Sequence, residues 1–538
     1  MTKFLKNPVI IIAQSNIVDY EAYNSLGIER LDLYKTSVYP RMVRYKDKFI
    51  SHLDYINLRK FNTTYLDSDY PQRRDLLNIW NMPSMSGIHL QNYLTVNDFS
   101  PLIINNLDSE VDWLQKWTDL YPDAPIVIST TFYLQWKEVG RIAKDVRKFT
   151  NNPIIIGGAF INSFVSDKGA TKALDFLKKY EIQYAIHSFN SEPDLLNLLN
   201  SIVKNDGKNL SKVSNLIVSN SENEFISEKK WHNPLVKEIE PIWDKLSINS
   251  LRSTLQIRTA SGCPFSCAFC SYPTTAKVWE TSDSDNVRRH LDSITRIPNL
   301  KNIIFIDDTF NVPVERFKKL IEIFKEYDFG WFSFLRVQFV DEEIVRTMKD
   351  SNCLGVYLGI ESSSDPILKN MNKQARRKDF LKGVNLLNKY DIDYVAAFVL
   401  GFPGETEETI KENIRFIEET PIKYYALKEF YYMENTSVHT KRDLYGLTGM
   451  GAKWSHNTMS YAQATDYKLR MFLTIKNSVH VDPDSSLWHL AHLNDLGFSR
   501  NEILNYQKEI NDLIRKDLLN HTTSRPFSES EMRLKITA

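Results

Sequence analysis

Three of the four cysteines of this 538-residue chain lie within eight positions of one another. Cys263, Cys267 and Cys270 have the spacing C-x3-C-x2-C, which places three soft thiolate ligands on one short loop. Iron–sulfur clusters are held by cysteine thiolates. A four-iron cube held by only three cysteines keeps one iron open, and an open iron can bind a substrate. The spacing therefore predicts a reactive iron–sulfur site rather than an electron-transfer centre.

Two other uses of these cysteines fit the pattern less well. A structural zinc site usually has four closed ligands, whereas Cys353 lies about eighty residues downstream with no paired ligand beside it. A disulfide framework needs an oxidising compartment and usually a small chain. Cys353 itself lies in an apolar run, which predicts a buried core thiol.

The cysteine loop, with Phe269 before its last cysteine, resembles that of the radical S-adenosylmethionine (radical SAM) enzymes. In that family the three cysteines, here Cys263, Cys267 and Cys270, ligate a [4Fe-4S] cluster. The open iron binds the amino and carboxylate groups of SAM, and the reduced cluster cleaves SAM into methionine and a 5′-deoxyadenosyl radical. The resemblance also implies that Phe269 lies near the adenine, and that an electron donor such as flavodoxin or ferredoxin is a partner.

Further segments between about 250 and 435 resemble family motifs that lie at the ends of barrel strands. Asp307 and Asp308 end an apolar run, and the resemblance implies that they reach toward the SAM amino group; a helix N-cap is the alternative. Arg336 follows the next run and is a candidate for the SAM carboxylate, with a surface arginine as the alternative. Glu361, in Gly-Ile-Glu-Ser, and Gly401, in Gly-Phe-Pro-Gly-Glu-Thr, are implied near the adenosyl part of SAM.

Short apolar runs alternate with helical stretches over the first ~200 residues, as expected for a doubly wound parallel sheet. In such sheets, ligands bind at the carboxyl ends of the strands. The residues that fall at such ends here are Ser129, Thr130, Gly157 and Gly158.

These strand ends resemble the two loops of the cobalamin-binding domain that precedes the barrel in one radical SAM subclass. The resemblance implies that Ser129, Thr130, Gly157 and Gly158 cradle the lower face and the nucleotide tail of cobalamin. The chain lacks the Asp-x-His-x-x-Gly motif whose histidine ligates cobalt in other cobalamin proteins, so no histidine ligand is expected. His89 is expected to pack on its helix. The alternative is a degenerate domain of the same fold, kept for packing or for substrate contact.

Together these patterns predict an α/β protein with a doubly wound sheet, a partial (β/α) barrel and a helical end. The expected parts are a Rossmann-like cobalamin-binding-type domain at 1–205, a connector at 206–250, a radical SAM partial barrel at 251–440 and a helical C-terminal domain at 441–538. Helical spacing is expected over 467–480 and over 501–519, the second beginning after Ser499.

Composition limits the classes of partner. Lys plus Arg and Asp plus Glu number 67 each, so no basic field indicates nucleic acid. No run reaches 18 apolar residues, so no membrane span is expected. The first residues lack the pattern of a signal peptide. With free thiols, this predicts a cytoplasmic protein.

A radical generated beside methylcobalamin predicts methylation of an unactivated centre of a small-molecule substrate, which is the dominant activity of the subclass. Two alternatives stay open: a cobalamin-dependent rearrangement or cyclisation, and a cobalamin-independent radical modification of a peptide or protein. The overall layout resembles the phosphinothricin P-methyltransferase group. His456, in a polar and aromatic block after the barrel, is a candidate for substrate orientation or acid–base chemistry, or is a hydrogen-bonded structural histidine.

Overall fold

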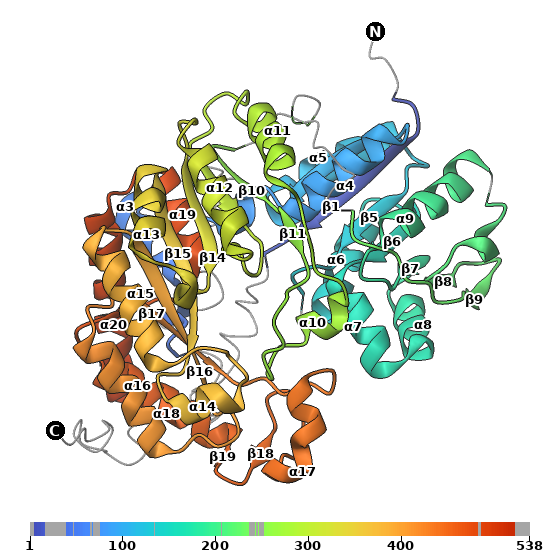
Figure 1. Ribbon diagram of the computed structural model, residues 1–538. Helices are drawn as coiled ribbons and strands as arrows, with labels where there is room; N and C mark the ends of the chain where they lie inside the picture. Colours follow the sequence, from blue (N-terminus) through green and yellow to red (C-terminus); the bar gives the residue numbers. More distant parts are fainter. Residues whose placement is uncertain are drawn as a thin grey trace.

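Two seven-stranded sheets organise the chain. Figure 1 shows them in two lobes, with the N-terminal sheet on the right and the second sheet, in yellow and orange, on the left. The computed structural model describes residues 5–16, 39–46, 48–64, 67, 76–133, 135–205, 207–235, 243, 246, 252–482 and 486–521.

The N-terminal sheet has the strand order β4-β1-β5-β6-β7-β8-β9. Its first five strands are parallel to one another. The strand β8 is antiparallel to β7, and β9 is antiparallel to β8. The parallel part follows the order 2-1-3-4-5, which places the topological switch point between β1 and β5. The strands are β1 (Pro8–Gln14), β4 (Ser100–Asn106), β5 (Ile126–Ser129), β6 (Ile154–Gly157), β7 (Tyr184–Ile186), β8 (Leu216–Ser219) and β9 (Glu224–Ile226).

Helices cover both faces of this sheet because successive strand residues point to opposite sides. Ile10 and Ile126 pack on one helical layer, while Val9 and Val127 pack on the other. The predicted doubly wound arrangement is confirmed. The first layer holds α5 (Leu107–Leu120), α6 (Trp136–Arg147), α7 (Ala159–Lys168) and α8 (Ala170–Lys179), and the second holds α4 (Met85–Val96) and α9 (Glu192–Leu199).

The second sheet is entirely parallel, with the order β10-β13-β14-β15-β16-β17-β20. Strands that are successive in this chain order lie side by side, as in a partial barrel, and this prediction is confirmed. The strands are β10 (Thr254–Ile257), β13 (Asn302–Phe305), β14 (Gly330–Leu335), β15 (Cys353–Glu361), β16 (Asp393–Leu400), β17 (Tyr424–Glu429) and β20 (Val479–His480).

Helices from the barrel segment pack on the outer face of this sheet, where Cys353 is 3% exposed, as predicted for a core thiol. They are α11 (Ser284–Ile294), α12 (Val314–Phe324), α13 (Glu342–Asp350), α14 (Asp365–Asn370), α15 (Arg377–Lys389) and α16 (Glu407–Glu419). Among the described residues, no helix is long and apolar enough to cross a membrane.

The C-terminal region is mostly helical, but the helix expected over 467–480 is wrong at its end. The helix α18 (Tyr461–Thr474) stops earlier, and the chain then forms β20, in which Val479 pairs with Tyr424 of β17. The end of the expected helix is a strand because these residues pair with the edge strand β17 of the barrel sheet. The second expected helix is confirmed as α20 (Arg500–His521), which begins after Ser499.

The inner face of the barrel is filled by a helix from the C-terminal region and by a residue from the N-terminal part. Leu487 and Ala491 of α19 (Ser486–Asp495) pack with Ile304 and Phe332 of the sheet, and Met82 joins the same cluster. The two lobes therefore share a hydrophobic cluster on the inner face of the barrel sheet.

A short segment that the sequence assigns to the N-terminal domain packs instead on the C-terminal helices. Ile50 and Ile56 share a cluster with Tyr424 and Ile510, and the blue α3 lies among orange and red elements in Figure 1. The segment contains β2 (Met42–Tyr45), β3 (Lys48–Ser51) and α3 (His52–Phe61). The domain limits at 205, 250 and 440 stay predictions, and residues 236–242 of the connector lie outside the described residues.

Candidate active site

The cysteine loop leaves β11 (Ala260–Ser261) and ends at α10 (Tyr272–Ala276). Gly262 enters it with φ +81°, and a Cβ there would lie 2.1 Å from the Val278 carbonyl oxygen, so only glycine fits. The Ala268 N–H donates to the Met371 carbonyl at 2.8 Å, which fastens the loop to the barrel.

Three free thiols lie together in this loop, with Cys267 buried and the other two partly exposed. Burial first, and then the charges of Cys267, Asp308 and Cys263, raise the pKa of Cys270 to about 12. Three thiolates on one short loop repel one another unless positive charge lies between them. In the described part of the chain, no three His, Cys, Asp or Glu side chains converge on a single ion. Because a four-iron cube is larger than one ion, its ligands lie farther apart, and the three-thiol donor set fits such a cluster.

Asp307 and Asp308 lie just after β13, and their surroundings differ. Asp307 is 1% exposed and accepts hydrogen bonds from the backbone N–H groups of Thr259 and Ala260, so its oxygens serve the entrance of the cysteine loop. Asp308 is exposed, yet burial by the surrounding protein and the charge of Asp307 raise its pKa to about 6. Asp308 is thus the open carboxyl of the pair.

Arg336 lies beneath the cysteine loop instead of on the surface. Its Nη2 donates to the Cys267 sulfur at 2.9 Å, and its guanidinium carbon lies 3.5 Å from the centre of the Phe265 ring. Nη1 donates to the Lys373 carbonyl at 3.2 Å. The side chain expected at the SAM carboxylate is therefore in contact with a cysteine.

Glu361 has φ +64° at an irregularity of β15, a conformation that non-glycine residues rarely adopt. Its carboxylate lies 2.9 Å from Nζ of Lys373, and both side chains are largely buried. Backbone strain persists where the surroundings over-determine it, and it concentrates at ligand sites. The ion pair holds the expected SAM-contacting carboxylate in a fixed position.

Gly401 has φ +83°, and a Cβ there would lie 2.5 Å from the Trp454 ring. His456 stacks on that ring at 5.1 Å and donates from Nε2 to the Gly401 carbonyl at 3.0 Å, while Nδ1 accepts from the Thr458 N–H at 3.3 Å. Burial lowers the pKa of His456. Both ring nitrogens are thus occupied, which matches the structural alternative for this histidine.

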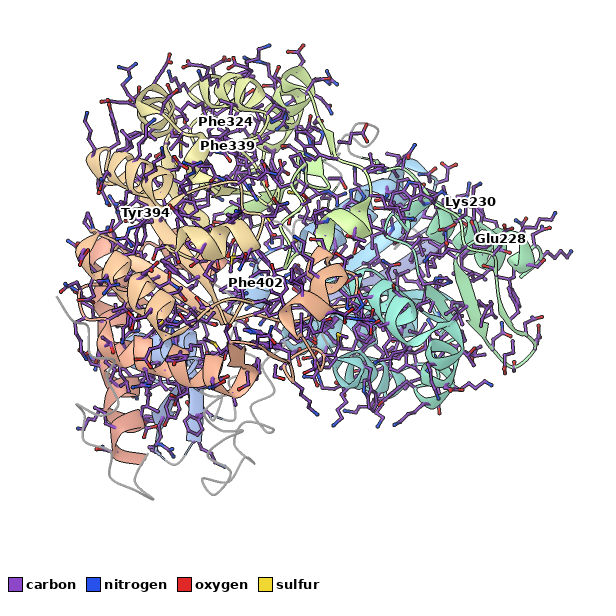
Figure 2. The ribbon with its side chains drawn as sticks, turned by 60° about the horizontal axis from the view of Figure 1, so that its bottom comes forward. Glu228, Lys230, Phe324, Phe339, Tyr394 and Phe402 are labelled. Atoms are coloured by element: carbon purple, nitrogen blue, oxygen red, sulfur yellow. The ribbon has the colours of Figure 1, made fainter. Side chains whose placement is uncertain are left out.

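Phe269 is partly buried, and its ring meets Phe402 edge-on at 6.3 Å. Phe402 belongs to the Gly-Phe-Pro-Gly-Glu-Thr segment. The contact brings together the two aromatic positions that the sequence places near adenosine. In Figure 2, Phe402 lies near the middle of the molecule, far from Glu228 and Lys230 at the outer edge of the N-terminal lobe.

At the edge of the N-terminal sheet, the four expected residues lie together but differ in accessibility. The Thr130 hydroxyl donates to the Gly157 carbonyl at 2.9 Å and is fully buried, so it joins the two loops. The Ser129 hydroxyl lies 3.0 Å from that of Thr131. Gly158 has φ +115°, whereas a Cβ on Gly157 would meet no atom closer than 3.8 Å. That Cβ would make ordinary contact with Ile186, so Gly157 is the less crowded of the two glycines.

Neighbouring polar groups at the same edge supply further donors. His187 follows β7 and is 4% exposed, and neither of its ring nitrogens has a hydrogen-bond partner among the described residues. Buried polar groups in proteins are normally hydrogen-bonded. An unpartnered buried histidine at the carboxyl end of β7 fits a site that receives a polar ligand. His89 instead pairs with Glu192 at 2.8 Å, as expected for a packing residue.

One ring contact joins this edge to the end of the cysteine loop: the Phe189 ring lies 5.8 Å from that of Tyr272 in α10. Elsewhere the Gln256 side chain of β10 donates to the Pro83 carbonyl at 2.9 Å. The two lobes therefore meet beside the cysteine loop.

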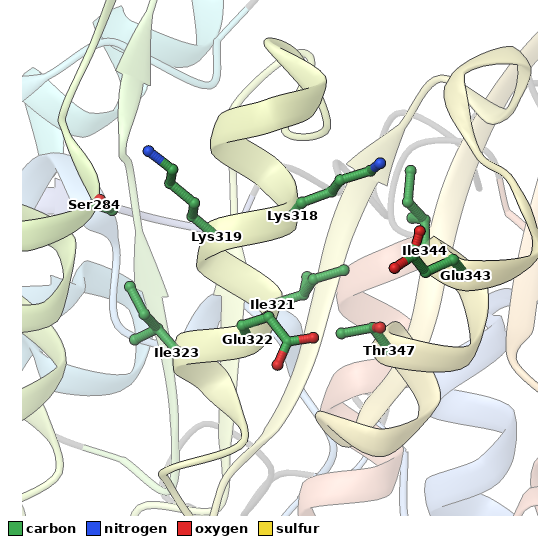
Figure 3. Close-up of a pocket in the computed structure, with 9 residues that line it drawn as sticks. All are labelled: Ser284, Lys318, Lys319, Ile321, Glu322, Ile323, Glu343, Ile344 and Thr347. Carbon is green, nitrogen blue, oxygen red and sulfur yellow. The ribbon is translucent and has the colours of Figure 1, made fainter.

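Another concave region lies away from these edges. The groove in Figure 3 is bordered by Lys318 and Ile321 of α12 and by Glu343 and Thr347 of α13, on the outer helical layer. No residue predicted for the site borders it.

Several residues of the site were not predicted. Tyr272 accepts the Gly262 N–H at 3.1 Å, and Glu405 accepts the Gly401 N–H. Both lie within or beside quoted motifs, so their proximity to those motifs was an available signal. Lys373 meets Glu361 only through the fold, and no pattern marks it. Phe265 lies inside the cysteine loop, but its contact with Arg336 also depends on the fold.

Comparison with known proteins agrees with this geometry. Residues 257–417 match the Radical SAM superfamily. The chain is 29% identical over 202 residues to an uncharacterised methyltransferase of Pyrococcus horikoshii, which covers 36% of this chain and 44% of that protein. It spans less than two thirds of the length of the curated relatives it first matches.

Two solved structures share the fold at low identity. One is the radical SAM methyltransferase TsrM from Kitasatospora setae, with cobalamin and a [4Fe-4S] cluster bound. Its TM-score is 0.56 at 15% identity, over 81% of this chain and 96% of that chain. The other is the cobalamin-dependent radical enzyme OxsB with aqua-cobalamin, with a TM-score of 0.57 at 16% identity, over 86% and 72%.

Proposed function

We propose that this chain, whose residues 257–417 are a radical SAM domain, methylates an unactivated centre of a small molecule with a [4Fe-4S] cluster, SAM and cobalamin. The observation that carries the proposal is the meeting of the two lobes beside the cysteine loop. The cysteine loop contacts the N-terminal lobe through Tyr272 and Phe189, so a substrate between the edges would face both cofactors.

When bound, the cofactors supply a carbon-centred radical from SAM and a methyl group from cobalamin, and the protein positions them and excludes water. Cys263, Cys267 and Cys270 would hold the cluster. Asp308 would accept a hydrogen bond from the SAM amino group, because it is the open carboxyl at the end of β13. Its companion Asp307 keeps the loop in place.

The adenosyl part of SAM would lie against the ends of β15 and β16. Glu361 is fixed there by Lys373, and Phe269 and Phe402 offer aromatic surface. The turn at Gly401 is held by His456 from outside, so we assign this histidine a positioning role.

Cobalamin would lie on the edge of the N-terminal sheet. Gly157 carries no side chain that would obstruct a bulky ring, and the unpartnered His187 offers a hydrogen bond to a peripheral amide of the cofactor. The proteins TsrM and OxsB, whose structures hold cobalamin, share this fold. We assign the N-terminal lobe the same ligand.

The reaction also needs a reductant and a substrate. We propose a flavodoxin- or ferredoxin-like donor for the cluster, and a reducing cytoplasm for a chain whose four cysteines are free. The structure of TsrM with tryptophan as its substrate supports a small-molecule substrate for this chain.

The experiment follows two fates of SAM in protein loaded anaerobically with iron, sulfide and hydroxocobalamin. With dithionite and methyl-labelled SAM, we expect 5′-deoxyadenosine from the cluster, and label on cobalamin together with S-adenosylhomocysteine. The first product without the second would favour a radical modification that does not use cobalamin. Absence of both would refute the proposal.

A further inference from the structure

Arg336 is a buried cation whose contacts all belong to the cysteine loop and its support. It is 7% exposed, stacks on Phe265 and donates to the Cys267 sulfur and the Lys373 carbonyl. Its backbone is fixed by Asn311, which accepts the Arg336 N–H at 3.0 Å and donates to its carbonyl at 2.8 Å. The side chain is thus positioned from both ends.

A buried guanidinium normally has an anionic partner, because an unpaired buried charge is costly. Within the described ranges, no carboxylate forms an ion pair with Arg336; the nearest charge-bearing candidate is the Cys267 sulfur at 2.9 Å. As a thiol, that sulfur is only a weak acceptor. Metal-bound cysteine is a thiolate, so as a ligand of the proposed cluster Cys267 would supply the missing negative charge.

We propose that Arg336 is a positioning residue that raises the reduction potential of the cluster through its hydrogen bond to the Cys267 sulfur, rather than a ligand of the SAM carboxylate. The inference rests on the proposed cluster site. Hydrogen bonds to the sulfurs set the potential of iron–sulfur clusters. One electron from a low-potential donor makes the cluster more negative, so a donor N–H stabilises the reduced form more than the oxidised form.

The geometry favours this role over SAM binding for a further reason. The planar guanidinium is held face-on by Phe265, and two of its nitrogens already donate within the protein. Three of its five N–H groups remain, but a side chain only 7% exposed offers them little access to a ligand. Asp308 and the open iron remain for the SAM end groups.

The test compares Arg336→Met with Lys373→Met in protein reconstituted anaerobically with iron and sulfide. Both variants remove one buried cation, but only the first removes an N–H donor to a sulfur. We expect Arg336→Met to lower the equilibrium constant for one-electron reduction of the SAM-free cluster on the order of tenfold, which lowers its reduction potential by about 59 mV. A redox titration followed by electron paramagnetic resonance measures this potential. Lys373→Met should shift the potential less. Equilibrium dialysis should give Arg336→Met an affinity for SAM within about twofold of wild type.

Three outcomes would overturn the inference. They are an unchanged potential, an equal shift in Lys373→Met, and a tenfold loss of SAM affinity at wild-type potential, which would return Arg336 to the SAM carboxylate. If Arg336→Met does not retain iron, Phe265→Leu is the second test, because it removes the ring that holds the guanidinium. This variant should lower the reduction potential by a smaller amount. An unchanged potential in Phe265→Leu would also overturn the inference. Failure of the wild type to bind iron would instead refute the cluster site.

Discussion

Asp307 accepts a hydrogen bond from the backbone N–H of Thr259 at 2.6 Å, and this contact joins the end of β13 to the chain that leaves β10. The same carboxylate accepts the Ala260 N–H at 2.9 Å. Since these residues lead into the cysteine loop, one buried carboxylate determines where the loop begins.

The two adjacent aspartates should therefore respond differently to substitution. Asp307→Ala leaves the buried N–H groups of Thr259 and Ala260 without their acceptor and should lower the free energy of unfolding by about 1–3 kcal/mol, with less iron retained. Asp308→Ala is the matched control, because Asp308 is exposed, and it should retain stability and iron while weakening SAM binding. Urea unfolding and iron analysis measure both. Equal stability losses in the two variants would contradict this division of roles.

Each cysteine of the loop should be necessary for the cluster. Changing Cys263, Cys267 or Cys270 to Ala should abolish formation of 5′-deoxyadenosine from SAM. Cys353→Ala should leave the iron content unchanged, because that thiol lies in the core of the barrel. A Cys263→Ala protein that still produced 5′-deoxyadenosine at the original rate would refute the assignment.

Glu405 should make stability depend on pH. Burial raises its pKa from the ordinary value of 4.5 to about 8. Because the folded pKa lies above the unfolded one, its contribution to stability is complete below about pH 4.5 and is lost as the pH rises toward 8. The slope reaches about 1.4 kcal/mol per pH unit. Glu405→Gln, which keeps an acceptor for the Gly401 N–H, should flatten the profile of unfolding free energy between pH 5 and 8. Identical slopes for the two proteins would be inconsistent with a buried neutral carboxyl.

The two neighbouring glycines of the N-terminal edge separate ligand binding from folding. Gly157→Leu places its Cβ in ordinary contact with Ile186 and adds a bulky side chain at the proposed cobalamin edge, so it should abolish uptake of hydroxocobalamin with little loss of stability. Gly158→Ala forces a side chain into φ +115° and should cost about 1–3 kcal/mol. Equilibrium dialysis and thermal unfolding measure the two effects. Normal cobalamin uptake by a folded Gly157→Leu protein would place the cofactor elsewhere.

Much of this architecture is predictable because it depends on local patterns. The Ile and Val runs identify buried parallel strands, and the residues that follow them, such as Asp307 and Gly157, reach the ligand edge by topology alone. Which of two adjacent residues is open does not follow from a pattern, because it depends on long-range donors such as the backbone N–H of Thr259.

Long-range packing explains what the sequence did not predict. The run that ends at His480 has helical spacing, but only its part up to Thr474 is helical. Its last two residues form a strand because β17 offers a free edge beside Tyr424. Ile56 leaves the N-terminal lobe because the C-terminal helix with Ile510 completes its core. Arg336 reads as a surface or SAM-binding residue until the fold brings Phe265 and Cys267 to it.

The central claim is that one chain holds both an open iron–sulfur cluster and a corrinoid. The most direct measurement is the content of iron, sulfide and corrinoid in the chain purified without oxygen from cells supplied with cobalamin. The account predicts about four irons, about four sulfides and about one corrinoid per chain. Protein that contains the iron and sulfide but no corrinoid, and takes up none from solution, would contradict it.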